Sequence, residues 1–314
     1  MSASTTTRRN ITVVLVFVPL ENLLEDVKNL LKTLGNESGT DYAVIGWCYK
    51  KHFWTQLETE MKKQPHQPLF VMKQAENVGK AQLINLAMDK IETFVKSPLP
   101  QYVSFCDCDL NLAPGTIETL LACADQVPNL GLISSNQSAN NSRHSFMDED
   151  PVVILENNQR IIIPELVTAV SGGLFAIPYD IWFEVGPLPT IALYYNEEAI
   201  LNLRLSFLDK VVCVASYVVA EHPGSKVSDY DEWKLKQCLE EHYIMGPHEK
   251  KSECPYVLVG PDQCKVYLKF PAAADTSSKY KNKEMANCVQ AYRNRYQASL
   301  KSGHDFWTSQ QKQE

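Results

Sequence analysis

The sequence has no excess of positive charge, no hydrophobic run long enough to span a membrane and no internal repeat. Its 37 acidic side chains outnumber the 30 basic ones, and the formal net charge is -7. No global basic field therefore attracts nucleic acid or anionic lipid. The apolar run 11–20 is far shorter than the roughly 20 residues of a spanning helix. Arg8 and Arg9 precede this run as in a signal peptide, but Pro19 and Glu21 follow it without a small-residue cleavage site, so we expect a buried first strand.

A disulfide framework and a zinc thiolate site are also not indicated. The nine cysteines are odd in number and scattered, which favours reduced thiols and a cytoplasmic location. Cys106 and Cys108 would need a second cysteine pair at suitable spacing to hold zinc, and no such pair is evident. We therefore expect both to pack as small hydrophobic residues. With 45% hydrophobic and 21% charged residues, the composition is that of an ordinary globular protein.

Strand and helix patterns alternate through the first half of the chain, which predicts an α/β fold with a mostly parallel central sheet flanked by helices. We expect a flexible N-terminus over residues 1–10, a main domain over 11–225 and a mainly helical C-terminal extension over 226–314. The predicted strands are 11–18, 42–48, 69–72, 102–106, 130–134 and 211–219, with a hairpin at 152–163. The predicted helices are 21–34, ended by Gly35, then 52–63, 78–94 capped by Asn77, 114–124 and 196–207.

The most informative segment ends the fourth predicted strand, where an apolar run stops at Asp107 and Asp109. Carboxylates at i and i+2 on an extended backbone point to the same face. The carboxyl ends of strands are where open α/β sheets bind ligands, and paired oxygen ligands suit Mg²⁺ or Mn²⁺. The pair therefore indicates an enzyme that handles a metal-bound phosphate ester. A plain turn rich in Asp at the end of a strand is the alternative.

Four further segments carry functional signals, each with an ordinary structural alternative. Gly79 and Lys80 begin a helix, where backbone N–H groups bind anions, or where the helix is simply capped. Gly172 and Gly173 permit close approach of a ligand to the backbone, or form a tight turn. Two acids, 197–198, open a helix, where one acts as general base for a hydroxyl acceptor or both are stabilised by the helix dipole. A histidine, 222, follows the last strand and completes the metal site, or is structural.

The order and spacing of these segments resemble the family-2-type inverting nucleotide-sugar glycosyltransferases with the GT-A fold. The resemblance covers residues 11–225, and the ordered set is more specific than any of its members. The matching segments are Val18-Pro19-Leu-Glu-Asn22, Asn77-Val-Gly79-Lys80-Ala81 with Asn85, Asp107-Cys-Asp109, Gly172-Gly173-Leu-Phe175 with Gly186, Glu197-Glu198-Ala-Ile-Leu201-Asn-Leu-Arg204, and His222.

The resemblance implies a metal-dependent enzyme that transfers a sugar from a nucleoside diphosphate-sugar to a hydroxyl acceptor with inversion. It implies Mn²⁺ or Mg²⁺ held by Asp109 and His222, with Asp107 near the metal or the ribose. Glu198 would deprotonate the acceptor; the family usually has Asp there, so the choice between Glu198 and Glu197 stays open. The implied donor-binding residues are Pro19, Asn22, Trp47, Asn77, Gly79, Lys80, Asn85, Asp107, Gly172 and Gly173.

One departure from the family concerns the nucleotide base. The family's second strand normally ends in an Asp that contacts the base, whereas this chain reads Ile45-Gly46-Trp47-Cys48. Trp47 either stacks on the base or belongs to the core. The donor nucleotide is therefore left open.

The acceptor is left open as well. Residues 265–301 contain eight basic side chains against two acidic ones, with tyrosines and a phenylalanine interleaved. This segment suits a phosphate-bearing partner such as nucleic acid, a glycan or another anionic polymer, or is a solvated amphipathic face. Two other classes of protein fit the same scaffold: a sugar-phosphate nucleotidyltransferase, whose usual Gly-rich loop after the first strand is missing here, and a non-catalytic nucleotide-sugar-binding module.

Overall fold

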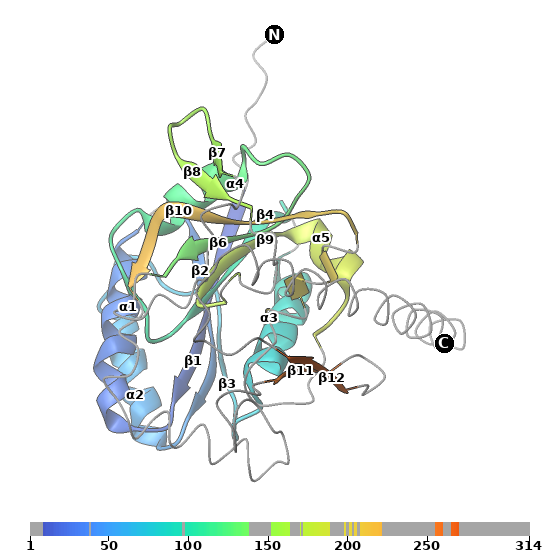
Figure 1. Cartoon of the computed structure of the whole chain (residues 1–314). Helices are drawn as coiled ribbons and strands as arrows, with labels where there is room; N and C mark the ends of the chain where they lie inside the picture. The colour runs from blue at the N-terminus through green and yellow to red at the C-terminus, as the bar shows by residue number, and fades with distance from the viewer. Residues whose placement is uncertain are drawn as a thin grey trace, which may run out of the picture.

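The fold is a ten-stranded mixed sheet with helices on both faces, together with a separate two-stranded sheet (Figure 1). A computed structural model describes residues 9–37, 39–95, 98–137, 152–163, 170, 172–188, 198, 201–202, 204–205, 208–221, 255–259 and 265–269. The strands of the large sheet are β1 (Arg9–Val18), β2 (Asp41–Cys48), β3 (Val71–Lys73), β4 (Pro100–Asp107), β5 (Asn111–Leu112), β6 (Leu130–Asn136), β7 (Val152–Ile154), β8 (Arg160–Ile162), β9 (Leu174–Pro178) and β10 (Val211–Glu221). The helices are η1 (Glu21–Leu23), α1 (Leu24–Asn36), α2 (Lys51–Met61), α3 (Lys80–Phe94), α4 (Thr116–Ala124) and α5 (Tyr179–Val185).

The sheet is mostly parallel, as the alternating pattern predicts. Its order is β3-β2-β1-β4-β9-β6-β10-β8-β7, with β5 paired to β10. β1 runs parallel to both β2 and β4, β2 parallel to β3, and β6 parallel to β10. The carboxyl ends of β1, β2 and β4 therefore meet at one edge of the sheet.

Strand β9 is the main element that the sequence patterns missed. It runs antiparallel between β4 and β6, so it inserts a reversed strand into the middle of the parallel set. The residues just before it are Gly172 and Gly173, for which the sequence indicated a close approach to a ligand or a tight turn. The glycine pair instead enters a fully internal strand, and this places it directly beside the end of β4.

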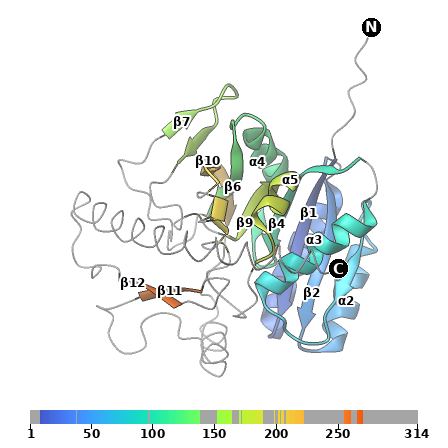
Figure 2. The same ribbon diagram turned by 90° about the vertical axis from the view of Figure 1, so that its right-hand side faces the viewer.

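The core is divided by the sheet into two hydrophobic layers. Helices α1, α2 and α4 cover one face, and α3 and α5 cover the other; Figure 2 shows the hairpin of β7 and β8 at the end of the sheet away from α2. Helix α1 packs through Val27, Leu30, Leu31 and Leu34, each no more than 3% exposed. This i, i+3, i+4, i+7 stripe is the predicted one, and each such side chain contributes about 1.5–3 kcal/mol by burial.

Two predicted helix boundaries were wrong. Gly35 lies inside α1, because the helix continues to Asn36, and it packs so closely on Gln64 that an added Cβ would lie 2.4 Å from the Gln64 Cβ. Asn77 is not the cap of α3. That position belongs to Gly79, whose φ of 81° favours glycine, while the Asn77 side chain accepts a hydrogen bond of 3.1 Å from the Gly79 N–H.

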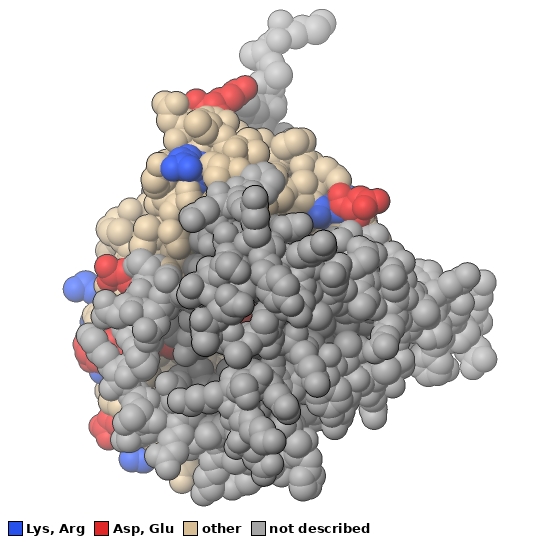
Figure 3. Space-filling view, viewed as in Figure 1, with Lys and Arg blue, Asp and Glu red and all other residues tan. Residues whose placement is uncertain are grey.

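Little of the C-terminal extension is described. Its described residues are β11 (Pro255–Val259) and β12 (Lys265–Lys269), which pair antiparallel rather than forming a helix. The mainly helical character predicted for 226–314, and the flexible N-terminus, stay predictions. In the described part of the chain, none of the helices combines the length and apolarity that crossing a bilayer requires. On the face seen in Figure 3, the acidic and basic side chains of the described residues are interspersed.

Two carboxylates face each other where α1 meets α4. The Gly115 N–H donates to the Glu37 Oε1 at 3.0 Å. Burial, together with the nearby Glu118, raises the pKa of Glu37 to about 7, against the lowering effect of the Gly115 hydrogen bond. Glu37 therefore holds its proton in the folded chain at pH values where the unfolded chain has lost it.

This pKa shift predicts that the free energy of unfolding falls as the pH rises from about 4.5 to about 7, since the folded state binds the extra proton there. Glu37→Gln should remove that dependence. Between pH 4.5 and pH 8, the wild type should lose about 1–2 kcal/mol more unfolding free energy than the variant. The figure is reduced because the Glu37 side chain is half-exposed. Urea unfolding at both pH values measures the difference. Equal pH dependence in both proteins would contradict the prediction, and Glu25→Gln, on the exposed face of α1, is the control.

Candidate functional site

Asp107 is the last residue of β4, at the edge where the parallel strands end. Its backbone N–H donates to the Gly173 carbonyl at 2.7 Å, which fixes the end of β4 against the glycine pair that enters β9. The strand stops here, and residues 108–109 form a turn. The expectation that both aspartates point to one face of an extended strand was therefore wrong, because the extended backbone ends at Asp107. Both side chains are half-buried.

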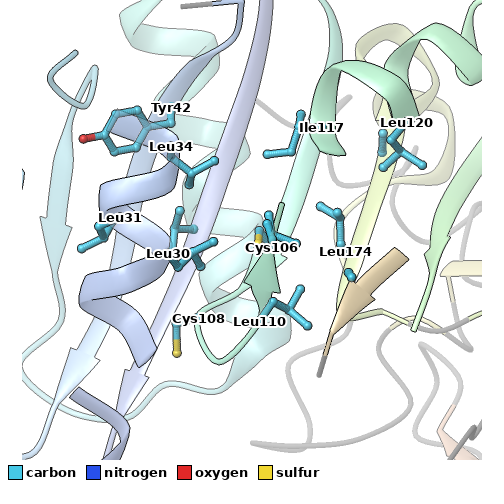
Figure 4. Packing of buried hydrophobic residues seen from close by; sticks show 14 of the residues in the cluster. Leu30, Leu31, Leu34, Tyr42, Cys106, Cys108, Leu110, Ile117, Leu120 and Leu174 are labelled. Atoms are coloured by element: carbon cyan, nitrogen blue, oxygen red, sulfur yellow. The ribbon is translucent and has the colours of Figure 1, made fainter. Parts of the chain in front are cut away.

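Both aspartates nevertheless act on the same neighbouring thiol. Burial raises the pKa of the Cys106 thiol well above its ordinary value, and the charges of Asp107 and then Asp109 raise it further. Both carboxylates therefore lie near one buried thiol. Cys108 has a raised pKa for the same main reason, burial. The two cysteines pack among hydrophobic residues, as predicted (Figure 4), and their burial favours the neutral thiol over the thiolate.

Lys80 joins this edge of the sheet to the glycine pair. Its Nζ lies 2.9 Å from the Asp107 Oδ1 and 3.0 Å from the Oδ2, and it donates to the Gly172 carbonyl at 2.9 Å. The Lys80 and Asp107 side chains are only 17% and 27% exposed. A charged hydrogen bond with this little exposure is stronger than a surface ion pair. Lys80 thus ties the start of α3 to both β4 and the segment before β9.

Glu198 reaches the same place from a distant part of the chain. A Cβ added to Gly172 would lie 2.7 Å from the Glu198 Cδ and 2.9 Å from its Oε1. The absence of a side chain at Gly172 therefore makes room for the carboxylate. Asn202, four residues later on the same helical face, donates to the Val170 carbonyl at 3.1 Å. Residues 198, 201–202 and 204–205 are helical, and we call them the Glu198 helix. These two contacts fix it on the segment that leads into β9.

Two further side chains, Arg204 and Asn85, support this arrangement through hydrogen bonds to the backbone. The buried Arg204 donates to the carbonyls of Val185 and Pro187 at 3.0 Å and 2.6 Å. The Asn85 amide donates to the Leu188 carbonyl and accepts from the Leu188 N–H, both at 2.8 Å. These side chains hold the chain after α5 against α3 and the Glu198 helix. For Asn85 this is a structural contact, and its predicted part in donor binding stays a prediction.

The remaining predicted site residues are placed as follows. Pro19 is buried just after β1, Asn22 is exposed in η1, and Trp47 is half-buried at the end of β2. Glu197 and His222 lie outside the described residues, so their roles are untested. In the described ranges, no three His, Cys, Asp or Glu side chains form a group that could hold a metal ion.

Gln137 is a site residue that the sequence patterns missed. A Cβ added to Gly173 would lie 1.7 Å from the Gln137 Nε2, so this amide lies directly on the glycine backbone. Gln137 comes directly after β6, which pairs in parallel with β10 in the large sheet. Its position just after the end of a parallel strand was the available signal.

Lys80→Met should lower the free energy of unfolding by about 1–3 kcal/mol at pH 7, because a charged hydrogen-bonding group is removed from partly buried partners. Lys80→Arg, which keeps the charge, should lose less. Lys63→Met is a matched control, since Lys63 is 63% exposed and pairs with Glu60, three residues earlier at the end of α2, where about 0–1 kcal/mol is expected. Urea unfolding measures all three. Equal losses for the Lys63 and Lys80 variants would show that the Lys80 contacts add nothing.

Comparison with known proteins gives a likeness in fold. No protein-family model matches the sequence, and no curated protein matches it. Among solved structures, the mannosyltransferase PcManGT from Pyrobaculum calidifontis, in complex with GDP-Man and Mn²⁺, matches with a TM-score of 0.52 at 14% identity, over 96% of this chain and 81% of that one. This likeness confirms the predicted GT-A-type α/β architecture.

Two other solved structures match less well. TarS from S. aureus, residues 1–349, gives a TM-score of 0.47 at 14% identity over 74% of this chain and 65% of its own. GalNAc-T7 with UDP, GalNAc and Mn²⁺ gives a TM-score of 0.49 at 11% identity over 79% of this chain and 53% of that one. Both TM-scores are too low to bear on the fold of this chain.

Proposed function

We propose that the chain is a metal-dependent glycosyltransferase that moves a sugar from a nucleoside diphosphate-sugar to a hydroxyl acceptor with inversion at the anomeric carbon. The observation that carries this proposal is the bridge from Asp107 through Lys80 and Gly172 to Glu198. It brings a strand-end carboxylate and a separate carboxylate onto one stretch of backbone. The fold shared with a mannosyltransferase that binds GDP-Man supports the same reaction class.

The residues at this edge fit a divalent cation in their chemistry. Asp107 and Asp109 supply carboxylate oxygens, which Mg²⁺ and Mn²⁺ prefer. Lys80 bonds to both Asp107 oxygens, yet each carboxylate oxygen has a further lone pair for another partner. Asp109, with His222, would hold the cation, and Asp107 would lie beside it. A bound cation would neutralise the negative charge that develops on the departing diphosphate.

Glu198 takes the role of general base in this proposal. As the acceptor oxygen attacks the anomeric carbon, its proton passes to the Glu198 carboxylate, and the bond from that carbon to the diphosphate oxygen breaks. The products are the glycosylated acceptor and the nucleoside diphosphate. Attack opposite the leaving group inverts the anomeric centre. Gly172 leaves the carboxylate room, and Asn202 fixes the helix that carries it. Glu197 is the alternative base.

The acceptor is named only by its hydroxyl group. The basic segment 265–301, which would contact an anionic polymer or nucleic acid, is described only over β12. Its role as an acceptor surface stays a prediction.

A thermal-shift screen followed by a turnover assay tests the proposal. Nucleoside diphosphates should raise the melting temperature when Mn²⁺ is present and not without it, because a ligand that binds only the folded form stabilises it. Incubation with common nucleotide-sugar donors and Mn²⁺ should then release nucleoside diphosphate. Release of pyrophosphate from a nucleoside triphosphate and a sugar phosphate would instead indicate a nucleotidyltransferase. Tight donor binding with no turnover on any acceptor would indicate a binding module.

A further inference from the structure

Lys80 contacts both oxygens of the carboxylate that ends β4. Its Nζ lies 2.9 Å from the Asp107 Oδ1 and 3.0 Å from the Oδ2. Because the two distances are nearly equal, the ammonium group lies between the oxygens, on the side from which a carboxylate binds a cation through both of them. A cation that binds Asp107 therefore either replaces the ammonium group or uses the outer side of one oxygen, with the ammonium group close by.

The charge of Lys80 also reaches the second aspartate of the pair. Burial, Asp107 and Asp109 raise the pKa of the Cys106 thiol, and Lys80 lowers it, so all three charges lie around one buried thiol. The Lys80 and Asp107 side chains are 17% and 27% exposed. Solvent and salt screen charges in such a place less than at an open surface. A cation bound by the aspartate pair is therefore within the field of the ammonium group.

A second acceptor holds the ammonium group at this place. Lys80 is the first residue of α3, and its Nζ donates to the Gly172 carbonyl at 2.9 Å. This contact joins α3 to a segment that lies 92 residues further along the chain. The Gly172 carbonyl therefore keeps the ammonium group beside Asp107 even when the carboxylate takes another partner.

Formal charges indicate which ligand relieves the repulsion between the ammonium group and a cation. The two aspartates are negative, and a divalent cation alone would neutralise them. With the positive Lys80 present, the aspartate pair, the lysine and a divalent cation together have a net positive charge. A diphosphate carries several negative charges and would neutralise this excess, and its oxygens give the ammonium group a new acceptor.

We propose that Lys80 opposes the binding of a divalent cation to the aspartate pair and makes that binding depend on the diphosphate of the donor. This inference rests on the proposed function and states how the same site takes up its two ligands. Lys80 weakens the binding of the cation by itself and strengthens the binding of the diphosphate once the cation is present. The cation and the diphosphate therefore bind cooperatively, each raising the affinity of the other by the same factor.

Isothermal titration of the full chain with Mn²⁺ alone is the first test. Lys80→Met and Lys80→Gln should each bind Mn²⁺ at least about tenfold more tightly than the wild type, because a positive charge beside Asp107 is removed. A lysine that only positioned Asp107 would give the opposite sign, since its removal would weaken Mn²⁺ binding. The Gln amide can still donate to the Gly172 carbonyl, so Lys80→Gln is expected to fold if Lys80→Met does not. Lys80→Arg keeps the charge and should bind Mn²⁺ as the wild type does.

Titration with inorganic pyrophosphate, without Mn²⁺ and with saturating Mn²⁺, is the second test. The ratio of the two affinities measures the coupling between the cation and the diphosphate. This ratio should fall by at least about fivefold in Lys80→Gln. Part of the coupling should remain in the variant, because pyrophosphate still bonds to the bound cation.

The matched control is Lys210→Met, which removes a lysine whose side chain is 19% exposed. Lys210 directly precedes β10, which runs in the same direction as β4, because β6 is parallel to β10 and both β4 and β6 are antiparallel to β9. Lys210 therefore lies at the opposite edge of the sheet from Asp107. Its removal should change neither the Mn²⁺ affinity nor the coupling.

An Mn²⁺ affinity in Lys80→Gln that is equal to or lower than that of the wild type, or an unchanged coupling, would overturn the inference. If pyrophosphate binding still requires Mn²⁺ in that case, the inference fails and the proposed function stands. If the wild type binds neither Mn²⁺ nor pyrophosphate together with Mn²⁺, both fail.

Discussion

Glu198→Gln is expected to lower kcat for sugar transfer by about 10²- to 10⁴-fold, the usual contribution of a general base, and to leave donor affinity unchanged. Glutamine has the same shape as glutamate, so the close contact with Gly172 and the position of the helix are kept. The side chain loses only its ability to take up the proton of the substrate hydroxyl. Donor affinity by titration and kcat by product release separate the two effects.

The control is Glu184→Gln, which neutralises an exposed carboxylate on α5 that lies 3.9 Å from the Lys210 Nζ; transfer should be unaffected. Loss of donor binding in Glu198→Gln would contradict the base assignment. A normal kcat in Glu198→Gln with a collapse of kcat in Glu197→Gln would move the role to the neighbouring residue.

Asp109→Asn is expected to weaken Mn²⁺ binding by at least about tenfold and to remove the Mn²⁺-dependent binding of nucleoside diphosphates. A neutral amide oxygen is a poorer ligand than a carboxylate, and changes even to residues behind the ligands cost about 10- to 100-fold in metal affinity. The fold should be kept, because Asp109 is half-buried in a turn after β4. Titration with Mn²⁺ alone gives the metal affinity directly, without an activity assay.

The comparison variant for this prediction is Asp180→Asn, an exposed aspartate in the first turn of α5, which should bind Mn²⁺ as the wild type does. An unchanged Mn²⁺ affinity in Asp109→Asn would exclude Asp109 as a ligand.

The parallel half of the fold was predictable because its signals are local. Each strand from β1 to β4 is a short apolar run, and each helix between them has a stripe of buried residues, as in α1. The boundaries were less predictable. Gly35 lies inside α1 and packs on Gln64, 29 residues away in sequence, and no local pattern contains that contact.

The reversed strand β9 was missed for a similar reason. Its five residues follow a glycine pair and end in Pro178, and both features locally indicate a turn. Its pairing partners, β4 and β6, lie far away in sequence and run in the opposite direction. The strand forms because its backbone can pair with both β4 and β6. The candidate site depends on this pairing, since β9 brings the glycine pair to the end of β4.

The candidate site was predictable as a set of residues and not as a set of contacts. The ordered motifs selected Lys80, Asp107, Gly172 and Glu198. The hydrogen bond from Lys80 to the Gly172 carbonyl spans 92 residues, and the fit of Glu198 against Gly172 depends on the missing Cβ. Sequence spacing contains neither fact. The motifs also gave no sign that the Asn85 amide bonds to the Leu188 backbone; its part in donor binding stays a prediction.

A crystal of the chain with Mn²⁺ and a nucleoside diphosphate tests the central claim most directly, through the anomalous signal of manganese. We expect one manganese peak within bonding distance of an Asp109 carboxylate oxygen, beside Asp107, with the diphosphate on the same ion. A manganese peak at another place in the molecule, or nucleotide bound away from the ends of β1 and β4, would contradict it.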